Sequence, residues 1–341
     1  MALFGLGAII GAYFGGKFTD KIGFYKVQLL TLFFGGIFFI VLGQIKSYPL
    51  ICLFTFLLSL INEPFRPANS SAIAFYSDSK NRTRSYSLNR LAVNLGWAVG
   101  GSIGGLLASV NYELLFWVDG ITNISAALLL FSFLKPKITI THKVETTEEV
   151  PQALSAYKDR TYLWYIVLVT LYGFCFFKLF TTIPKYFRDD LFLNERFIGL
   201  LMAVNGIIIV LLEMVLIFTL EKKNKNMYYV FIGTIMCALS YLFLLIPGEG
   251  MFIAFCMIVI ISFGEILSMP FMNTFWTLRS NDKNRGQYAA LVTMAWGVAQ
   301  TTGPFFCAAL VQATNFKVLF VLLGLVLLVT AFGFLKLDKK G

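Results

Sequence analysis

The chain has 341 residues, of which 58% are hydrophobic, 16% aromatic and only 13% charged. A soluble domain carries about 25% charged residues, so this composition excludes an ordinary soluble enzyme or binding domain. The net charge of +10 would suggest nucleic-acid binding in a soluble protein, whereas here its distribution indicates membrane orientation. One histidine and five cysteines without ligand spacing predict no metal site.

Hydrophobic segments follow one another along the chain, and the longer ones suffice to cross a hydrocarbon core of about 30 Å as helices. This predicts an all-α membrane protein, because helices satisfy their own backbone hydrogen bonds in lipid. The hydrophilic stretch 135–160 is the predicted central linker between an N-terminal lobe, 1–134, and a C-terminal lobe, 161–341. Eleven segments are expected, at 1–16, 27–45, 49–76, 87–110, 112–134, 161–187, 195–220, 227–246, 250–278, 287–313 and 315–335.

The basic residues are distributed unequally between alternate loops. Of the 28 lysines and arginines, 21 lie in the loops after the odd-numbered segments or at the C-terminus, and 5 lie in the other loops. Because cytoplasmic loops are enriched in lysine and arginine, we expect a multi-pass protein of the cell inner (plasma) membrane. The central loop and the C-terminus are then cytoplasmic.

The two halves of the chain repeat with a shift of 201 residues. Asp20 falls on Glu221, and Arg84 falls on Arg285. One shift aligns helix ends and loops, which favours a parallel repeat of the kind found in transporters. Under this shift the first helix of the second half corresponds to a position before Met1. We therefore expect a parent of twelve helices, six per lobe, truncated so that the first is missing, and a genuine eleven-helix protein is the alternative.

The first motif is "GGKFTDKIGFYK", which lies between two apolar segments. It resembles the loop between helices two and three of the major facilitator superfamily, most of all in its bacterial drug:proton antiporter-like branch. The resemblance implies a cytoplasmic gating latch whose acid faces a helix N-terminus. An ordinary positively charged loop is the alternative, and "EKKNK" after Leu220 is interpreted as a decayed copy of the latch that acts as an orientation signal. The proposed latch residues are Gly16, Asp20, Lys21 and Gly23, and Phe18 also matches the motif.

The second motif is "GWAVGGSIGG", whose glycines form two rows on a helix. Such rows allow close helix approach. The motif resembles the antiporter motif on helix five of the same family, although Gly101 stands in place of its proline. Generic small-residue packing is the alternative. The predicted helix-packing residues are Gly96, Gly100, Gly101, Gly104 and Gly105.

Ionisable residues within apolar segments are costly in lipid, at about 2.5–3.5 kcal/mol each. We therefore expect them to face one another or a wet interior. Glu63 and Arg66 are expected to pair, since they lie three positions apart. Glu265 is the expected proton-carrying acid, unless Lys178 neutralises it. The six such residues are Glu63, Arg66, Asp119, Lys178, Glu213 and Glu265, and the candidate coupling or cavity set is Glu63, Arg66, Asn69, Lys178, Glu213, Glu265 and Asn273.

The resemblance implies a secondary active transporter that works by alternating access and exports drugs or small metabolites in exchange for protons. Proton-coupled uptake of a sugar or peptide is one alternative, and a transport-dead or sensor-like truncated protein is another. An enzyme is not expected, because no motif resembles a nucleophile with its base. No cofactor and no nucleic-acid partner are expected. The expected partners are a small-molecule substrate, protons and the lipid bilayer, with the chain acting as a monomer.

Overall fold

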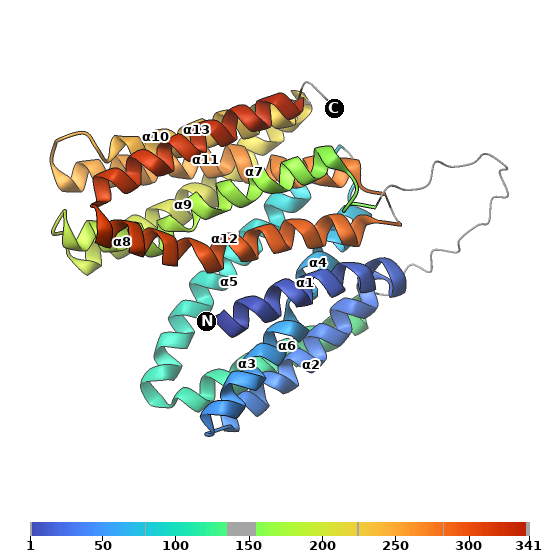
Figure 1. The fold of residues 1–341 in the computed structure, drawn as a ribbon. Coiled ribbons are helices and arrows are strands. Elements are labelled where there is room, and N and C mark those ends of the chain that lie inside the picture. The colour runs from blue at the N-terminus through green and yellow to red at the C-terminus, as the bar shows by residue number, and fades with distance from the viewer. Residues whose placement is uncertain (1, 79, 135–154, 224, 282, 339–341) are drawn as a thin grey trace, which may run out of the picture. The chain divides into compact units, whose positions relative to one another are not determined.

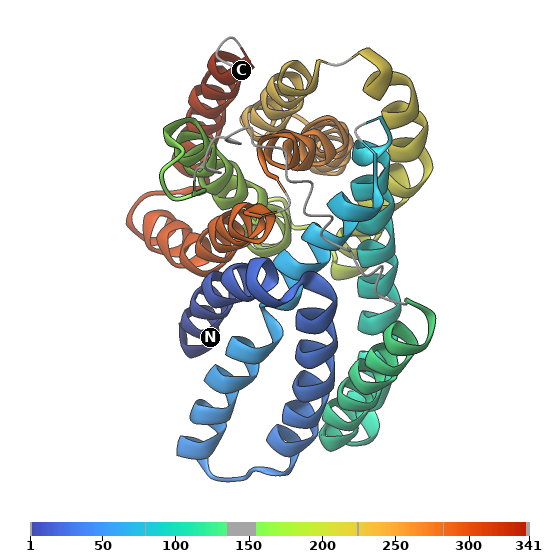
Figure 2. The same ribbon diagram turned by 90° about the vertical axis from the view of Figure 1, so that its right-hand side faces the viewer.

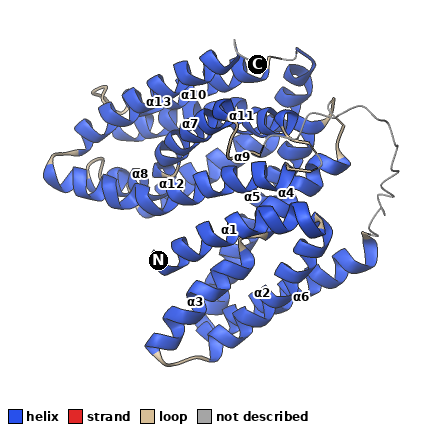
Figure 3. Cartoon of the chain, turned by 45° about the vertical axis from the view of Figure 1, so that its right-hand side comes forward, coloured by secondary structure: helices blue, strands red, loops and turns tan. Residues whose placement is uncertain are grey.

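The computed structural model describes residues 2–78, 80–134, 155–223, 225–281 and 283–338, so residues 135–154 of the predicted linker lie outside the described residues. Every regular element in the described ranges is a helix (Figure 3). In chain order these are α1 (Ala2–Ile22), α2 (Phe24–Gln44), α3 (Tyr48–Asn62), α4 (Phe65–Tyr76), α5 (Arg82–Val110), α6 (Tyr112–Phe133), α7 (Arg160–Phe176), α8 (Lys178–Asp189), α9 (Glu195–Leu220), a short 3₁₀ helix (Glu221–Lys223), α10 (Asn226–Phe243), α11 (Gly250–Arg279), α12 (Arg285–Ala313) and α13 (Phe316–Asp338) (Figure 1).

Two pairs of these helices are halves of one interrupted span. α3 and α4 are separated only by Glu63 and Pro64, and proline cannot donate the backbone hydrogen bond that would continue the helix. α7 and α8 are separated only by Phe177. The described helices therefore form eleven helical stretches, one for each predicted hydrophobic segment.

Eight of the described helical stretches are long and apolar enough to cross a membrane. The other three helical stretches are α1, α5 and α12, which carry more polar residues and glycines. These three helices also supply most of the polar contacts described below. The predicted all-α membrane fold is confirmed.

The described residues form two compact units, and each contains segments far apart in the chain. The first comprises 1–76, 98–160 and 280–294, and the second comprises 77–97, 161–279 and 295–341. The helices α5 and α12 thus each contribute residues to both units. The division into two sequential lobes stays a prediction.

Helix boundaries agree with the repeat of 201 residues. Adding 201 to the first residues of α2, α3, α5 and α6 gives 225, 249, 283 and 313, and α10, α11, α12 and α13 begin at 226, 250, 285 and 316. Packing repeats too, because α2 packs on α6 as α10 packs on α13. Figure 1 shows α10 and α13 side by side, and the blue helices α1, α2 and α3 lie together in Figure 2.

Glycines bring the backbones of neighbouring helices close together within each unit. A Cβ atom on Gly36 of α2 would lie 2.6 Å from the carbonyl oxygen of Gly120 on α6. A Cβ on Gly233 of α10 would lie 2.6 Å from the carbonyl oxygen of Gly264 on α11. Small residues at helix interfaces allow this close packing in membranes.

Candidate functional site

The candidate site in the second unit is one arginine shared by two buried carboxylates. Arg90 of α5 donates from Nη1 to Oε2 of Glu213 at 2.8 Å and from Nη2 to Oε2 of Glu265 at 2.6 Å. The two glutamates, on α9 and α11, are 3% and 1% exposed, and Arg90 is 16% exposed. One guanidinium therefore joins three helices, and with both acids ionised the three side chains carry a net charge of −1.

We call Arg90, Glu213 and Glu265 the arginine cluster. Neutral side chains around it bond the second oxygen of each carboxylate. Ser87 donates to Oε1 of Glu213 at 2.6 Å. Asn205 donates to Oε1 of Glu265 at 3.1 Å and to the hydroxyl of Ser262 at 2.9 Å. Each carboxylate thus has its second oxygen bonded as well, which holds both acids in one geometry.

One face of the first half of α5 carries the polar groups that reach α9 and α11. Thr83, Ser87 and Arg90 are spaced by four and then three residues, so they lie on the same side of the helix. The hydroxyl of Thr83 lies 2.8 Å from that of Thr274 on α11. This polar stripe explains why α5 is less hydrophobic than its neighbours.

The arginine cluster corrects two expectations. Arg90 lies in the predicted segment 87–110 but is not among the six ionisable residues expected within apolar segments, and it supplies the positive charge of this buried cluster. Glu265 was expected to lack a cationic neighbour unless Lys178 supplied one, and its partner is Arg90. The available sequence signal was Arg90 itself, which follows Ser87 by three residues at the start of a segment, together with two acids left without a base.

In the first unit, Asp20 caps the N-terminus of α12. Its Oδ1 accepts from the backbone N–H of Gly286 at 2.5 Å, and its Oδ2 accepts from that of Gln287 at 3.0 Å. The first amides of a helix have no partners within the helix and favour an anion. The glycines permit this approach, because a Cβ on Gly16 would meet Ala290 and the carbonyl oxygen of Gly286. We call this the α1–α12 contact.

The remaining predicted latch residues lie beside this contact. Lys21 is exposed, in the last turn of α1. Gly23 joins α1 to α2 with φ of +89°, a conformation that glycine adopts without steric cost. Burial raises the pKa of the Asp20 carboxyl to about 6, although the amides of Gly286 and Gln287 and the charge of Arg285 lower it.

A second contact of the same kind occurs at the repeat-related position in the second unit. Glu221 accepts from the backbone N–H of Thr83 at 3.0 Å and from Nε of Arg84 at 2.7 Å, at the start of α5. Glu221 and Arg84 correspond to Asp20 and Arg285 under the 201-residue shift. Although "EKKNK" was interpreted as a decayed copy, Glu221 keeps the capping interaction, and the role of the segment as an orientation signal stays a prediction.

The Major Facilitator Superfamily family model matches residues 1–281 of the chain. The chain belongs to the major facilitator superfamily. It is therefore a multi-pass membrane transporter and not an enzyme, as predicted. The comparisons with individual proteins agree with this membership.

Two similar relatives of this family member are named for antiport and drug resistance. The Na(+), Li(+), K(+)/H(+) antiporter of Planococcus maritimus is 23% identical over 323 residues, which cover 85% of this chain and 76% of that protein. The class C tetracycline resistance protein of Escherichia coli is 25% identical over 252 residues, 71% of this chain and 61% of that protein. Among solved structures, the major facilitator superfamily transporter FucP in the outward conformation has a TM-score of 0.76 at 11% identity, and 98% of this chain and 88% of that chain are covered.

The other predicted coupling residues of this transporter make contacts within their own units. Glu63 and Arg66 form the expected ion pair at 2.9 Å, at the break between α3 and α4. Asn69 accepts from Gln28 at 3.2 Å. Asn273, on α11, accepts from the indole N–H of Trp276 at 3.2 Å. Their roles in transport stay predictions.

Lys178 is the first residue of α8, and it is fully buried. Its ammonium lies 4.8 Å from the ring centroid of Phe174 and has no hydrogen-bond partner among the described residues. The expected alternative, a salt bridge from Lys178 to Glu265, is not formed.

The predicted helix-packing motif "GWAVGGSIGG", residues 96–105, lies on α5. A Cβ on Gly96 or on Gly100 would meet no described atom within 4 Å, and one on Gly104 would meet only Leu115, at 3.8 Å. The close packing expected at Gly96 and Gly100 is therefore not formed in this structure. The side-chain surroundings of Gly101 and Gly105 lie outside the description.

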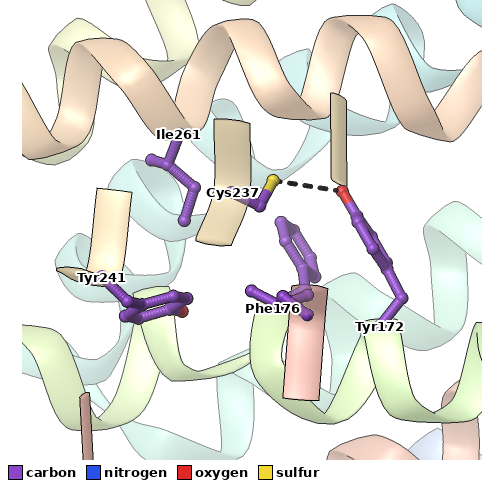
Figure 4. A pocket seen from close by; sticks show the side chains of 6 residues that line it. Tyr172, Phe176, Cys237, Tyr241 and Ile261 are labelled. Atoms are coloured by element: carbon purple, nitrogen blue, oxygen red, sulfur yellow. Dashed lines mark hydrogen bonds between the residues drawn. The ribbon is translucent and has the colours of Figure 1, made fainter. Parts of the chain in front are cut away.

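The aromatic residues of α7 pack against α10 and α11 in the second unit. The hydroxyl of Tyr172 points to the sulfur of Cys237 at 3.7 Å (Figure 4). The space enclosed by Tyr172, Phe176, Cys237, Tyr241 and Ile261 has no room for a water molecule. This region is a packed interior and not a substrate cavity.

Proposed function

We propose that this transporter exports drugs or small metabolites in exchange for protons, by alternating access of its two repeat-related halves. The names of the relatives support export and antiport as the first choice. The observation that carries proton coupling is the arginine cluster. Two buried carboxylates share one guanidinium, so binding one proton brings the three side chains from a net charge of −1 to zero. A neutral cluster costs less to keep away from water than a charged one.

The arginine cluster also supplies a mechanical link. Arg90 ties α5 to α9 and α11, and a proton on Glu213 or Glu265 weakens one of its two charge-assisted hydrogen bonds. We propose that this loosening lets α5 move, so that proton binding changes the balance between inward-facing and outward-facing states.

The α1–α12 contact and the Glu221 contact at the start of α5 are proposed as cytoplasmic latches. Support comes from their positions in loops rich in lysine and arginine, which would face the cytoplasm. Each latch is an acid that caps a helix N-terminus, and such a bond contributes about 0.5–2 kcal/mol. Two such contacts suffice to bias a two-state equilibrium without locking it.

The test is proton-driven flux in inside-out vesicles that contain the full chain, with tetracycline and ethidium as probes. We expect an imposed pH gradient to drive accumulation of at least one probe. Glu265→Gln should abolish the dependence on the gradient, and Glu249→Gln, an exposed acid before α11, should not. Flux in the opposite direction would favour the uptake alternative. No gradient-driven flux in either direction, with folded protein present, would favour the transport-dead alternative.

A further inference from the structure

The end of the predicted central linker is a short docked turn in the first unit. The backbone N–H of Lys158 donates to the carbonyl oxygen of Ser155 at 2.8 Å, and α7 begins two residues later, at Arg160. Connecting segments run over the protein surface, where their side chains are exposed to water. Ala156, inside this turn, is instead 0% exposed. The turn is therefore packed against the protein and does more than connect.

Two side chains of this segment bind the first turn of α12. Ser155 donates to Oε1 of Gln287 at 3.0 Å. The hydroxyl of Tyr288 donates to Oδ2 of Asp159 at 2.8 Å, and Tyr288 is 2% exposed. Gln287 is also the residue whose backbone N–H binds Asp20. The segment thus holds the same turn of α12 that Asp20 caps.

A third side chain of the segment packs on α1. The ring of Tyr157 lies edge-on to that of Tyr13, with the ring centroids 5.7 Å apart. Burial raises the pKa of the Tyr157 phenol to about 12, and the neighbouring Tyr13 and Asp20 add to this effect, so the phenol stays neutral. Its hydroxyl is buried and has no hydrogen-bond partner in the described part of the chain. Because such a hydroxyl is unfavourable, the packing of the ring has to account for this position.

The segment therefore contacts both helices of the α1–α12 contact. Tyr157 lies against α1, and Ser155 and Asp159 bind α12. One short turn can make both sets of contacts only while the two helix ends lie together. An interaction that exists in one arrangement and not in another shifts the equilibrium toward the first. These contacts accordingly favour the closed arrangement over an open one.

We propose that residues 155–159 act as a clasp that holds the α1–α12 contact closed, with Tyr157 and Asp159 as its positioning residues. Tyr157 fixes the clasp to α1, and Asp159 fixes it to α12. This inference rests on the proposed latch role of the α1–α12 contact and adds the regulation of that latch. The position of the linker end then sets how readily the contact opens.

The test is amide hydrogen exchange at Gly286 and Gln287 in the purified full chain, at one fixed pH. Tyr157→Ala removes the ring from α1, and Asp159→Ala removes the acceptor of the Tyr288 hydroxyl. Each should accelerate exchange at the two amides about fivefold, the effect of losing one ordinary hydrogen bond. The matched control is Lys158→Ala, an exposed residue of the same turn, which should exchange as the wild type does.

Conservative variants separate the proposed contacts from general effects of substitution. Tyr157→Phe keeps the ring and loses only the unpaired hydroxyl, so its exchange should stay within about twofold of the wild type. Asp159→Asn keeps an oxygen that can accept from Tyr288, and it should retain most of the protection. Exchange in Tyr157→Ala and Asp159→Ala at the wild-type rate would overturn the proposal. Equal acceleration in Tyr157→Phe and Tyr157→Ala would also overturn it, since ring packing would then not be the cause.

A second set of amides separates opening of the contact from loss of stability. The amides of α10, in the second unit, should exchange at the wild-type rate in every variant. Acceleration there as large as at Gly286 and Gln287 would mean that the variants unfold the protein as a whole. Tyr157 and Asp159 would then be structural residues, and the clasp would be overturned.

These results are distinguishable from failure of the proposed function. Absence of proton-driven flux in the wild type, with exchange that still depends on Tyr157 and Asp159, would remove proton coupling and leave the clasp standing. Proton-driven flux as expected, with exchange that does not depend on these two residues, would remove only the clasp.

Discussion

Removing Arg90 should destabilise the protein more than removing any other arginine that forms an ion pair in the described structure. In Arg90→Met the carboxylates of Glu213 and Glu265, 3% and 1% exposed, lose their shared cation. Breaking a buried ion pair by removing one partner costs about 3–5 kcal/mol, since the remaining charge stays away from water. We expect a loss of this size in the free energy of unfolding at pH 8.

The physical reason can be separated from simple loss of packing. Methionine keeps most of the volume of the arginine stem, so the cavity contribution is small. In the triple variant Arg90→Met/Glu213→Gln/Glu265→Gln the uncompensated charges are gone, while the amides can still bond to Ser87 and Asn205. We expect this variant to recover most of the lost stability, because neutral replacements of buried ion pairs are often tolerated.

The assay is denaturant unfolding in detergent micelles, followed by tryptophan fluorescence. The matched control is Arg84→Met, whose side chain is 35% exposed and which should cost about 1 kcal/mol or less. The reasoning is refuted if Arg90→Met is no less stable than Arg84→Met. It is also refuted if the triple variant is no more stable than Arg90→Met alone.

Two further predictions concern the α1–α12 contact. In the α1–α12 contact, burial raises the pKa of Asp20 from 3.8 to about 6. The closed contact therefore binds a proton more readily than a state with Asp20 exposed to water. We expect the contact to become more stable as the pH falls from 7 to 5, and less stable as the pH rises through about 6. The measurement is amide hydrogen exchange at Gly286 and Gln287, corrected for the intrinsic effect of pH on exchange. Protection of these amides should increase as the pH falls from 7 to 5 in the wild type, and should not depend on pH in Asp20→Asn. The same pH dependence in both proteins would exclude Asp20 as the titrating group. Gly286→Ala should open the contact, since its Cβ would meet the carbonyl oxygen of Gly16, at a cost of about 1–3 kcal/mol. Gly297→Ala, where a Cβ meets nothing within 4 Å, should be neutral or stabilising by about 0.4–1 kcal/mol, and equal unfolding free energies for the two variants would contradict the packing argument.

Local sequence predicts much of the fold, because a segment that crosses lipid has to be apolar and has to satisfy its own backbone hydrogen bonds. Apolar runs give the spans, and the repeat gives the equivalence of α2 with α10 and α5 with α12. The Glu63–Arg66 pair is local too, since three positions on a helix put the side chains on one face. The resemblance of the motif around Asp20 implies that the acid faces a helix N-terminus, and in the structure Asp20 accepts from the first amides of α12.

What only the tertiary structure decided is which charges share a partner. Arg90 lies 123 residues from Glu213 and 175 from Glu265, and no local spacing predicts that one guanidinium serves both. Local spacing likewise does not predict that Glu221 accepts from the backbone N–H of Thr83, which lies 138 residues away. Nor does it predict that Gly303 lies against the ammonium of Lys178. Sequence patterns state that a charge within a span needs a counter-charge. Helix packing over long chain separations decides which residue supplies it, because ion pairs depend on distances of a few ångströms in space and not on separation along the chain.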